Sequence, residues 1–378
     1  MSRTESMEKA EYGYWLANLP GIGLRKIERL LEIFMDSKTV YEATEKELHA
    51  LKKDGILPEQ FSSRDIETIL GTRDKDEIHD SYTKLISRGI YFVTREDNEY
   101  PEQLRNIFGA PYGLYVKGKL PGRKEKCLAI IGARECSPYG REMAACLSDA
   151  AARAGIAVIS GLARGIDGYA HEGALAAGGA TYGILGCGID ICYPRENFKL
   201  YMEMQREGGV ISEYAPGTRP AAGNFPMRNR IISGISDAVV VIEAKKKSGS
   251  LITVDLGLEQ GKEIYAIPGK ATDRLSEGCN NLIKMGAKLV TSPKDILEDF
   301  IPNYEQTMDE MKKNNKLLEK VGKIVYASLC LEPKHIEEIA QMTGLSLEVL
   351  MEQLFLLEMD GFVRQTRKNY YVVAAASK

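Results

Sequence analysis

The spacing of apolar residues divides the chain into three segments with different periodicity. Between residues 8 and 88 the apolar side chains recur three to four positions apart, which predicts amphipathic helices. From residue 89 to 300, short apolar runs alternate with helical stretches. A polar stretch follows, and the last segment returns to helical spacing before two short strand-like runs. We therefore predict a helical domain at 1–88, an α/β core at 89–300, a linker at 301–315 and a small domain at 316–378.

The central segment has the pattern of a doubly wound sheet. Several of its apolar runs are almost uninterrupted, as in parallel strands that are buried on both faces, and helical stretches separate most of them. The predicted strands are 127–133, 156–160, 180–185, 209–213, 237–243, 263–267 and 287–290. In such sheets the ligand binds at the carboxyl ends of the strands, near the point where the strand order reverses. Candidate functional residues should therefore follow these strands.

The N-terminal segment contains a short glycine-rich turn between two helical stretches, at residues 19–26. This arrangement resembles a helix-hairpin-helix (a SAM-like helical domain), in which the amides of the turn hold a DNA phosphate. A possible secondary DNA contact therefore consists of Gly21, Gly23, Arg25 and Lys26. Glycines also serve simply to make tight turns between helices, and that alternative stays open.

The C-terminal segment has the element order of a winged helix. The expected helices cover 317–329, 335–343 and 347–360, and the expected strands cover 362–365 and 370–373. The third helix, which reads DNA in many winged helices, carries Glu348, Glu352 and Glu358 and no Lys or Arg. Phosphates repel such a face. We therefore predict a module for protein contact or regulation.

The overall charge limits the kinds of nucleic-acid site that are possible. The 378 residues carry a formal net charge of −3, which argues against a broad basic surface that coats duplex DNA. Any such site must be local. No apolar run approaches the ~18 residues of a membrane span, and the first eleven residues are too polar for a signal peptide. The seven cysteines show neither a CxxC pair nor metal-ligand spacing. We expect a protein of the reducing cytoplasm without a bound metal.

Two predicted helix starts carry features that bind anions. Residues 225–230 place Arg228 and Arg230 at one start, and residues 248–253 form a small-residue loop that opens the next helix. Unpaired amides at a helix N-terminus attract anions, and guanidinium groups fit phosphate oxygens in pairs. The arginines could instead neutralise Glu213 or Asp237. Phe225 is either a stacking surface for a base or a core residue. We assign the three lysines just before the second loop, 245–247, to a solvated turn.

Two further strand ends offer backbone amides and a cation. Gly132 and Arg134 follow the strand at 127–133, and Gly161 and Arg164 follow the strand at 156–160. Asp167 and His171, four residues apart, share a helix face and form either an acid–base pair or a structural contact, which we favour. The sequence contains no dinucleotide fingerprint and no P-loop. Without a nucleophile or a metal set, we predict a binding protein that is not an enzyme and has no cofactor.

In chain order, these motifs closely resemble the DNA-processing protein A family (DprA, also called Smf). The resemblance rests on Gly132-Ala-Arg134, on residues 160–167 with His171, on Tyr193-Pro194, on residues 225–230 and 248–253, and on Pro268-Gly269. It implies an extended Rossmann-like core, a homodimer, and the loading of the RecA recombinase onto single-stranded DNA in natural transformation. By motif position, the DNA pocket would be lined by Gly132, Arg134, Gly161, Arg164, Phe225, Arg228, Asn229, Arg230, Ser248, Gly249, Ser250 and Thr253.

The alternative is a nucleotide phosphoribohydrolase with a related Rossmann-like fold. These enzymes use a loop of the type Pro-Gly-Gly-x-Gly-Thr-x-x-Glu. Thr253 fits that pattern, but Leu256 occupies the position of the catalytic glutamate. The missing carboxylate removes the obvious means of stabilising a cationic sugar in the transition state.

Overall fold

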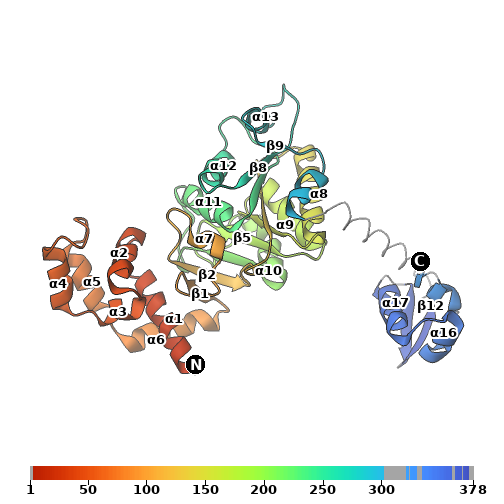
Figure 1. Ribbon diagram of the computed structural model, residues 1–378, viewed down its shortest axis with the longest axis horizontal. Helices are drawn as coiled ribbons and strands as arrows, with labels where there is room; N and C mark the ends of the chain where they lie inside the picture. The colour runs from red at the N-terminus through yellow and green to blue at the C-terminus, as the bar shows by residue number, and fades with distance from the viewer. Residues whose placement is uncertain are drawn as a thin grey trace. The chain divides into compact units, whose positions relative to one another are not determined.

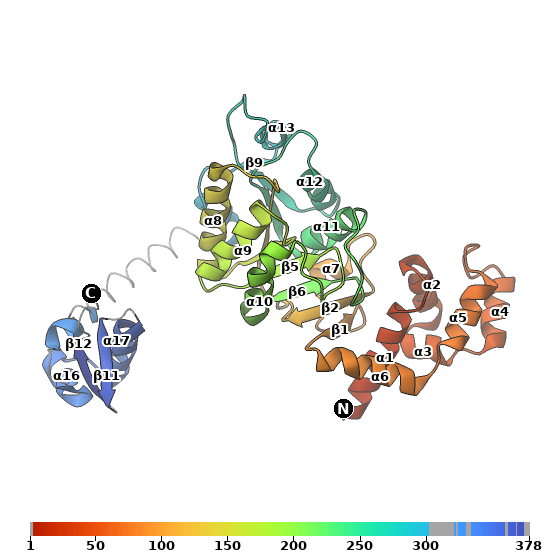
Figure 2. The same ribbon diagram turned by 180° about the vertical axis from the view of Figure 1, so that it is seen from behind.

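The computed structural model describes residues 3–301, 321–322, 324–329, 334–359, 362–367 and 369–373. The chain forms two compact units, Met1–Phe300 and Ile301–Lys378, which are drawn in Figures 1 and 2. Apart from Ile301, the predicted linker at 301–315 lies outside the described residues. The predicted boundary at residue 88 falls inside the first unit and stays a prediction.

The first part of the larger unit is helical, as its periodicity predicts. Its helices are α1 (Arg3–Ala17), α2 (Leu24–Phe34), α3 (Ser37–Glu42), α4 (Glu45–Lys53), α5 (Ser63–Gly71) and α6 (Lys75–Ser87). Capping boxes start two of them, because Thr44 and Glu47 satisfy each other's backbone amides at α4, as Ser62 and Asp65 do at α5. The helices share a buried core around Trp15.

The core of the larger unit is a nine-stranded sheet in the order β1-β2-β6-β5-β4-β3-β7-β8-β9. The strands are β1 (Tyr91–Thr94), β2 (Gly113–Gly118), β3 (Cys127–Ile131), β4 (Ala157–Ser160), β5 (Thr181–Leu185), β6 (Gly209–Ser212), β7 (Ala238–Val241), β8 (Glu263–Ala266) and β9 (Lys288–Leu289). Strands β3 to β9 pair in parallel. The order reverses between β3 and β7, so the predicted doubly wound, Rossmann-like sheet with a switch point is confirmed.

Helices cover both faces of this sheet (Figure 1). The connections of β3, β4 and β5 place α8 (Pro138–Arg153), α9 (Ile166–Ala176) and α10 (Phe198–Glu207) side by side on one face. The other face carries α7 (Glu102–Arg105), α11 (Asn224–Ile235) and α12 (Gly249–Glu259). The unit ends with α13 (Glu277–Lys284) and α14 (Lys294–Phe300).

The hairpin of β1 and β2 is the part of the sheet that our sequence analysis missed. Through β2 it pairs antiparallel with β6, the last strand of the parallel part of the sheet. The run at Tyr91–Thr94 has only four residues, and Gly113–Gly118 begins and ends with glycine, so neither stands out as a buried strand. The hairpin covers the outer side of β6, so β1 is the edge strand at this end of the sheet.

An aromatic cluster joins the helical part to this hairpin. Tyr14 of α1 lies 5.6 Å from the Phe92 ring, and Phe92 lies 4.7 Å from the Tyr115 ring, both measured between centroids. Tyr82 of α6 contacts Tyr14 at 5.5 Å. Aromatic rings bury large areas and so dominate the energy of such contacts. The helices and the sheet edge therefore share one core, which continues into Leu185 and Met204.

The smaller unit is a winged helix, as predicted. It contains β10 (Lys334–His335), α16 (Ile336–Thr343), α17 (Leu347–Met359), β11 (Val363–Arg367) and β12 (Tyr370–Val373), with strand order β10-β12-β11. The short strand β10 was not predicted. Of the first predicted helix, 317–329, only residues 321–322 and 324–329 are described, and most of these are helical.

The structure also bears on two features of the composition, the apolar runs and the cysteines. In the described portions of the chain, no helix is both long and apolar enough to cross a membrane. Of the six cysteines described, Cys127, Cys187 and Cys279 are buried, and burial raises the pKa of each thiol. The remaining three, Cys136, Cys146 and Cys192, are half-buried or exposed.

The hairpin offers a direct test of the shared core. A Cβ atom on Gly113 would lie 2.1 Å from a carbon of the Phe92 ring. That ring cannot move aside, because Tyr14 and Tyr115 hold it. We expect Gly113→Ala to lower the free energy of unfolding by about 1–3 kcal/mol, the usual cost of overpacking. Urea denaturation measures the change.

A glycine on the neighbouring loop supplies the matched control. A Cβ on Gly122 would meet only the Glu125 side chain, at 3.7 Å. Gly122→Ala should therefore change the stability by no more than about 0.5 kcal/mol. Equal losses in the two variants would contradict the packing described for the hairpin.

Candidate nucleic-acid interface

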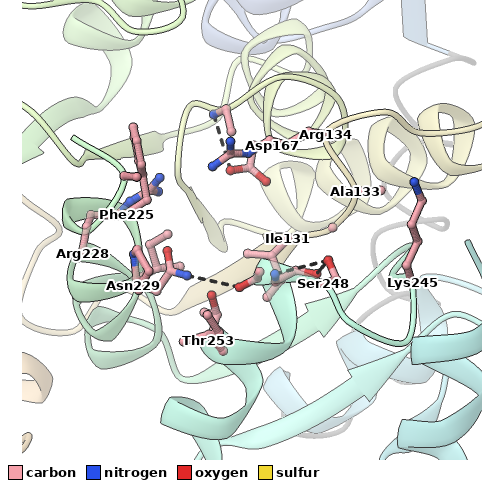
Figure 3. Close-up of a pocket in the computed structure, with 18 of the residues that line it drawn as sticks. Ile131, Ala133, Arg134, Asp167, Phe225, Arg228, Asn229, Lys245, Ser248 and Thr253 are labelled. Carbon is pink, nitrogen blue, oxygen red and sulfur yellow. Dashed lines mark hydrogen bonds between the residues drawn. The ribbon is translucent and has the colours of Figure 1, made fainter. Parts of the chain in front are cut away.

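A cavity of about 720 Å³ opens at the carboxyl ends of the central strands (Figure 3). Its walls come from the loops after β3, β4, β5, β6 and β7 and from the first turns of α11 and α12. This is the switch point of the sheet, where open α/β folds bind their ligands. We call this cavity the central pocket.

The loop after β3 forms one wall of the central pocket. Gly132 is packed so tightly that a Cβ there would lie 2.6 Å from Ile166. Gly165, at φ +70°, lies against the same loop, where a Cβ would be 2.3 Å from the Ala133 carbonyl oxygen. The Ile166 amide donates to that oxygen at 3.1 Å. The two glycines thus lock the loops after β3 and β4 together and leave Arg134 exposed at the rim.

Phe225 projects from the first turn of α11 into a stack of flat groups. The Arg134 guanidinium lies 5.4 Å from the centroid of the Phe225 ring, and the Tyr193 ring lies 5.7 Å away. Gly186 makes room for the phenylalanine, because a Cβ there would be 2.8 Å from its ring. Phe225 is half-buried and Tyr193 is 45% exposed, so aromatic surface faces the cavity. Such surface stacks on nucleobases.

Arg228 is a buried cation at the floor of the central pocket. Its side chain is only 4% exposed, and its Nε and Nη1 atoms have no hydrogen-bond partner among the described residues. A Cβ on Gly161 would lie 1.7 Å from Nη1, so only glycine at that position leaves room for the guanidinium. Burial lowers the pKa of Arg228 to about 10, which keeps it charged at neutral pH.

Asp167, in the first turn of α9, supplies the negative charge beside Arg228. Its carboxylate accepts from the Gly161 amide at 3.1 Å and from the Ala163 amide at 3.4 Å. Burial raises the pKa of Asp167, while the charge of Arg228 and these two amides lower it. The carboxylate thus holds the β4 loop in place and offsets part of the buried positive charge.

The loop between β7 and α12 forms the opposite wall. Ser248 caps α12, since its hydroxyl accepts from the Ser250 amide at 3.4 Å, and Asn229 of α11 donates to the Gly249 carbonyl at 3.4 Å. Lys245 and Lys247, both exposed, lie on the same wall. Figure 3 shows Lys245 and Ser248 across the cavity from Phe225. A helix N-terminus with serine hydroxyls and lysines attracts phosphate.

The structure brings together most of the residues predicted for the pocket. Those that line the cavity are Gly132, Arg134, Phe225, Arg228, Asn229, Ser248, Gly249, Ser250 and Thr253. Gly161 lies behind the lining and makes room for Arg228. The predicted set therefore forms one site, apart from two arginines.

Arg164 and Arg230 do not line the central pocket. Arg164 pairs with Glu196 at 2.6 Å on the exposed surface. Arg230 is 7% exposed and pairs with Glu213 at 2.6 Å, which is the alternative that the sequence left open. On α11, residue 230 points away from the face that carries 225, 228, 229 and 232, because of the 3.6-residue period. Its role is structural in this geometry.

Other pocket residues were missed by the sequence analysis. We assigned Lys245 and Lys247 to a solvated turn, but both line the cavity. Tyr193 was named only among the motifs of the family resemblance, and Pro220 and Ala222 come from the loop that follows β6. A signal for the lysines existed, because they follow β7 at the switch point.

The histidine that shares a helix face with Asp167 lies in a buried structural contact. His171 is fully buried and its Nδ1 lies 2.6 Å from the Thr181 hydroxyl oxygen. The Thr181 hydroxyl donates its hydrogen to the Val158 carbonyl, so His171 Nδ1 is the donor to the Thr181 oxygen. Burial lowers the pKa of His171 to about 3, and the ring stays neutral. The structural alternative that we favoured matches this arrangement.

The possible secondary contact at the N-terminal turn has the expected backbone shape. Gly21 has φ +74°, and Gly23, exposed, precedes the first residue of α2. Lys26, however, is held by Asp65 at 2.8 Å, whereas Arg25 is exposed. A DNA contact at this turn stays a prediction.

Comparison with known proteins identifies the family. Residues 91–301 match the family model described as DNA recombination-mediator protein A, and residues 317–367 match that of the DprA winged helix domain. The Smf protein of Synechocystis sp. is 30% identical over 95% of this chain and 98% of its own length. The DNA processing protein DprA of Streptococcus pneumoniae is 43% identical over 54% of this chain and 72% of its own length.

Two solved structures are similar to this one. The DprA structure from Streptococcus pneumoniae covers 76% of this chain and 96% of its own, with 32% identity and a TM-score of 0.65. The DNA processing protein A structure from Helicobacter pylori, described by its single-stranded DNA binding mode, covers 55% and 95%, with 28% identity and a TM-score of 0.50. With the switch-point pocket and the winged helix, these matches show that the chain belongs to the DNA recombination-mediator protein A (DprA/Smf) family.

Proposed function

We propose that this protein binds single-stranded DNA in the central pocket and delivers it for recombination. The observation that carries the proposal is the convergence of Arg134, Lys245, Lys247 and the α12 N-terminus on the aromatic surface of Phe225. Cations and amides hold the phosphates of a strand, while an aromatic face stacks on an unpaired base. The relative from Helicobacter pylori, which is described by its binding of single-stranded DNA, supports the proposal.

The pocket favours an unpaired strand over a duplex. Stacking on Phe225 and Tyr193 requires a base whose face is free, and a duplex hides its base faces in the helical stack. The side chains of the central pocket do not form paired hydrogen-bond donors and acceptors that match the edge of one particular base. Sequence preference should therefore be slight. The cationic groups number four, against the two carboxylates of Asp167 and Glu135, so the site is positive although the whole chain is not.

The proposal includes a role beyond binding. The family model is described as a recombination mediator, and the motif resemblance implies loading of RecA onto single-stranded DNA in natural transformation, by a homodimer. A mediator needs no chemistry of its own. Leu256 occupies the sequence position of the phosphoribohydrolase glutamate, and it does not line the central pocket.

Arg134 and Arg164 provide a matched pair for testing the site. Arg134→Ala removes a cation and a flat group at the rim of the pocket, so affinity for a fluorescently labelled oligothymidylate should fall about tenfold or more. The slope of log affinity against log salt should become shallower by about 0.7, the value for one phosphate contact with a single strand. Fluorescence anisotropy measures both.

Arg164→Ala is the control, because it removes the same charge from the ion pair with Glu196 outside the pocket. We expect its affinity to stay within about twofold of the wild type, since exposed ion pairs contribute little. Equal losses in the two variants would place the DNA somewhere other than the central pocket.

Arg228 supports the pocket by balancing Asp167. Arg228→Met leaves a buried carboxylate without its counter-charge, and the free energy of unfolding should fall by about 3–5 kcal/mol at neutral pH. Asp167 already has a raised pKa in the folded state, so the folded protein binds the proton more tightly than the unfolded chain. Stability therefore falls as the pH rises through the folded-state pKa, and the variant should recover stability towards acid pH.

Urea denaturation at several pH values measures this dependence. The double variant Asp167→Asn/Arg228→Met should regain much of the loss and should show a weaker pH dependence, because no buried charge remains. A single variant whose loss is independent of pH would contradict the electrostatic role of Arg228.

RecA loading has its own test. We expect the wild type to accelerate RecA filament assembly on single-stranded DNA that is coated with single-strand-binding protein. The DNA-dependent ATPase activity of RecA measures this assembly. Arg134→Ala should lose most of that acceleration, because the DNA is no longer held, and Arg164→Ala should keep it. If the wild type binds the DNA but leaves RecA assembly unchanged, the mediator role fails while the binding site stands.

A further inference from the structure

The winged helix carries a surface that the DNA site does not use. Helix α17 occupies the place of the recognition helix, which in DNA-binding winged helices enters the major groove. Its inner face is buried through Leu350, Gln353 and Leu354, which close the core of the domain together with Ile339 and Val363. The fold of the domain is therefore complete without any contribution from the opposite side of the helix.

The opposite side of α17 is apolar and exposed. Met351, Phe355 and Met359 follow one another at four-residue intervals, so they form a ridge along the helix. Their side chains are 59%, 61% and 72% exposed, and Leu356 beside them is 42% exposed. We call this ridge, with Leu356 and the carboxylates of Glu348 and Glu352, the outer face of α17. Contiguous apolar surface of this kind on a folded domain marks an interaction site.

The charges on the outer face oppose a nucleic-acid partner. Glu348 and Glu352 are exposed and lie on the same side as Phe355, and α17 contains no Lys or Arg. In the described part of the chain, neither carboxylate forms an ion pair. Glu358 differs, since it accepts from the Gln365 amide at 2.9 Å. Phosphates would meet uncompensated negative charge here. Helix α17 therefore has the position of a DNA-reading helix but not the positive charge that binding to DNA requires.

The same charges define the partner that fits. An apolar ridge with acidic groups along it is complementary to a helix with an apolar stripe flanked by Lys or Arg. Methionine side chains adapt to the shape of what covers them, which suits a helix-on-helix contact. A second copy of α17 would fit less well, because it would bring its own carboxylates to this face.

We propose that the outer face of α17 docks a basic amphipathic helix of a partner protein. The contact is independent of the central pocket, which lies in the other compact unit. The winged helix thereby gives a DNA-binding protein a second attachment, one that recognises protein.

A pair of designed peptides tests this docking on the full chain. One is a helical repeat of Leu and Lys with an apolar stripe, and the other has Glu at every Lys position. We expect the wild type to bind the labelled Leu/Lys peptide at least ten times more tightly than the Leu/Glu peptide in fluorescence anisotropy. Phe355→Ser/Met359→Ser should weaken the first by tenfold or more, and Glu348→Lys/Glu352→Lys should reverse the preference.

The control removes equally exposed apolar groups from another helix. Phe198 and Met202 of α10 are 57% and 48% exposed and do not line the central pocket. Phe198→Ser/Met202→Ser should leave peptide binding unchanged, and all variants should keep the affinity of the wild type for single-stranded DNA.

Three results would overturn the proposal. The first is a wild type that does not distinguish the two peptides. The second is an equal loss of binding in the α17 and α10 variants. The third is self-association of the wild type that disappears in Phe355→Ser/Met359→Ser, without binding of the Leu/Lys peptide, which would assign the outer face to a second copy of the chain.

Discussion

The buried guanidinium of Arg228 is the constraint on which the switch-point site is built. It enters from α11, lies against the backbone of Gly161 after β4, and is balanced by Asp167 from α9. Helix α11 and the segment from β4 to α9, which are far apart in the sequence, thus meet at one charge. A buried charge without a neighbour of opposite sign costs several kcal/mol, so the loops cannot drift apart without exposing or isolating it. The walls of the central pocket are held at their spacing by this interaction.

This arrangement explains how a slightly acidic chain can present a site for a polyanion. Other arginines of the unit are paired with carboxylates, as Arg164 is with Glu196 and Arg230 with Glu213. The cations at the rim of the pocket have a different environment, since Arg134 stacks on Phe225 and the two lysines extend from an open loop. Local concentration of unpaired positive charge, and not the total, determines where phosphate is attracted.

Much of this could be predicted from the sequence. The parallel strands and the winged-helix order follow from the apolar pattern, and nine of the twelve residues that the family resemblance places in the pocket line the cavity. The failures have a common cause. Arg230 is two residues from Arg228 and looks equivalent in the sequence, but the helical period turns it towards Glu213. Lys245 and Lys247 look like an ordinary charged turn until the sheet order places that turn beside β3. Gly161 was predicted as a ligand contact, and it takes part by leaving space for another side chain.

The aromatic contact between α1 and the β1–β2 hairpin has a practical consequence for dissecting the protein. The match to the family model begins at residue 91, which invites truncation at that point. Such a fragment would lose Tyr14 and Tyr82 and leave the rings of Phe92 and Tyr115 uncovered on a sheet edge. Bare aromatic surface beside an edge strand promotes aggregation. Shortened versions of this chain should therefore keep the helical part, α1 to α6, even when only the central pocket is of interest.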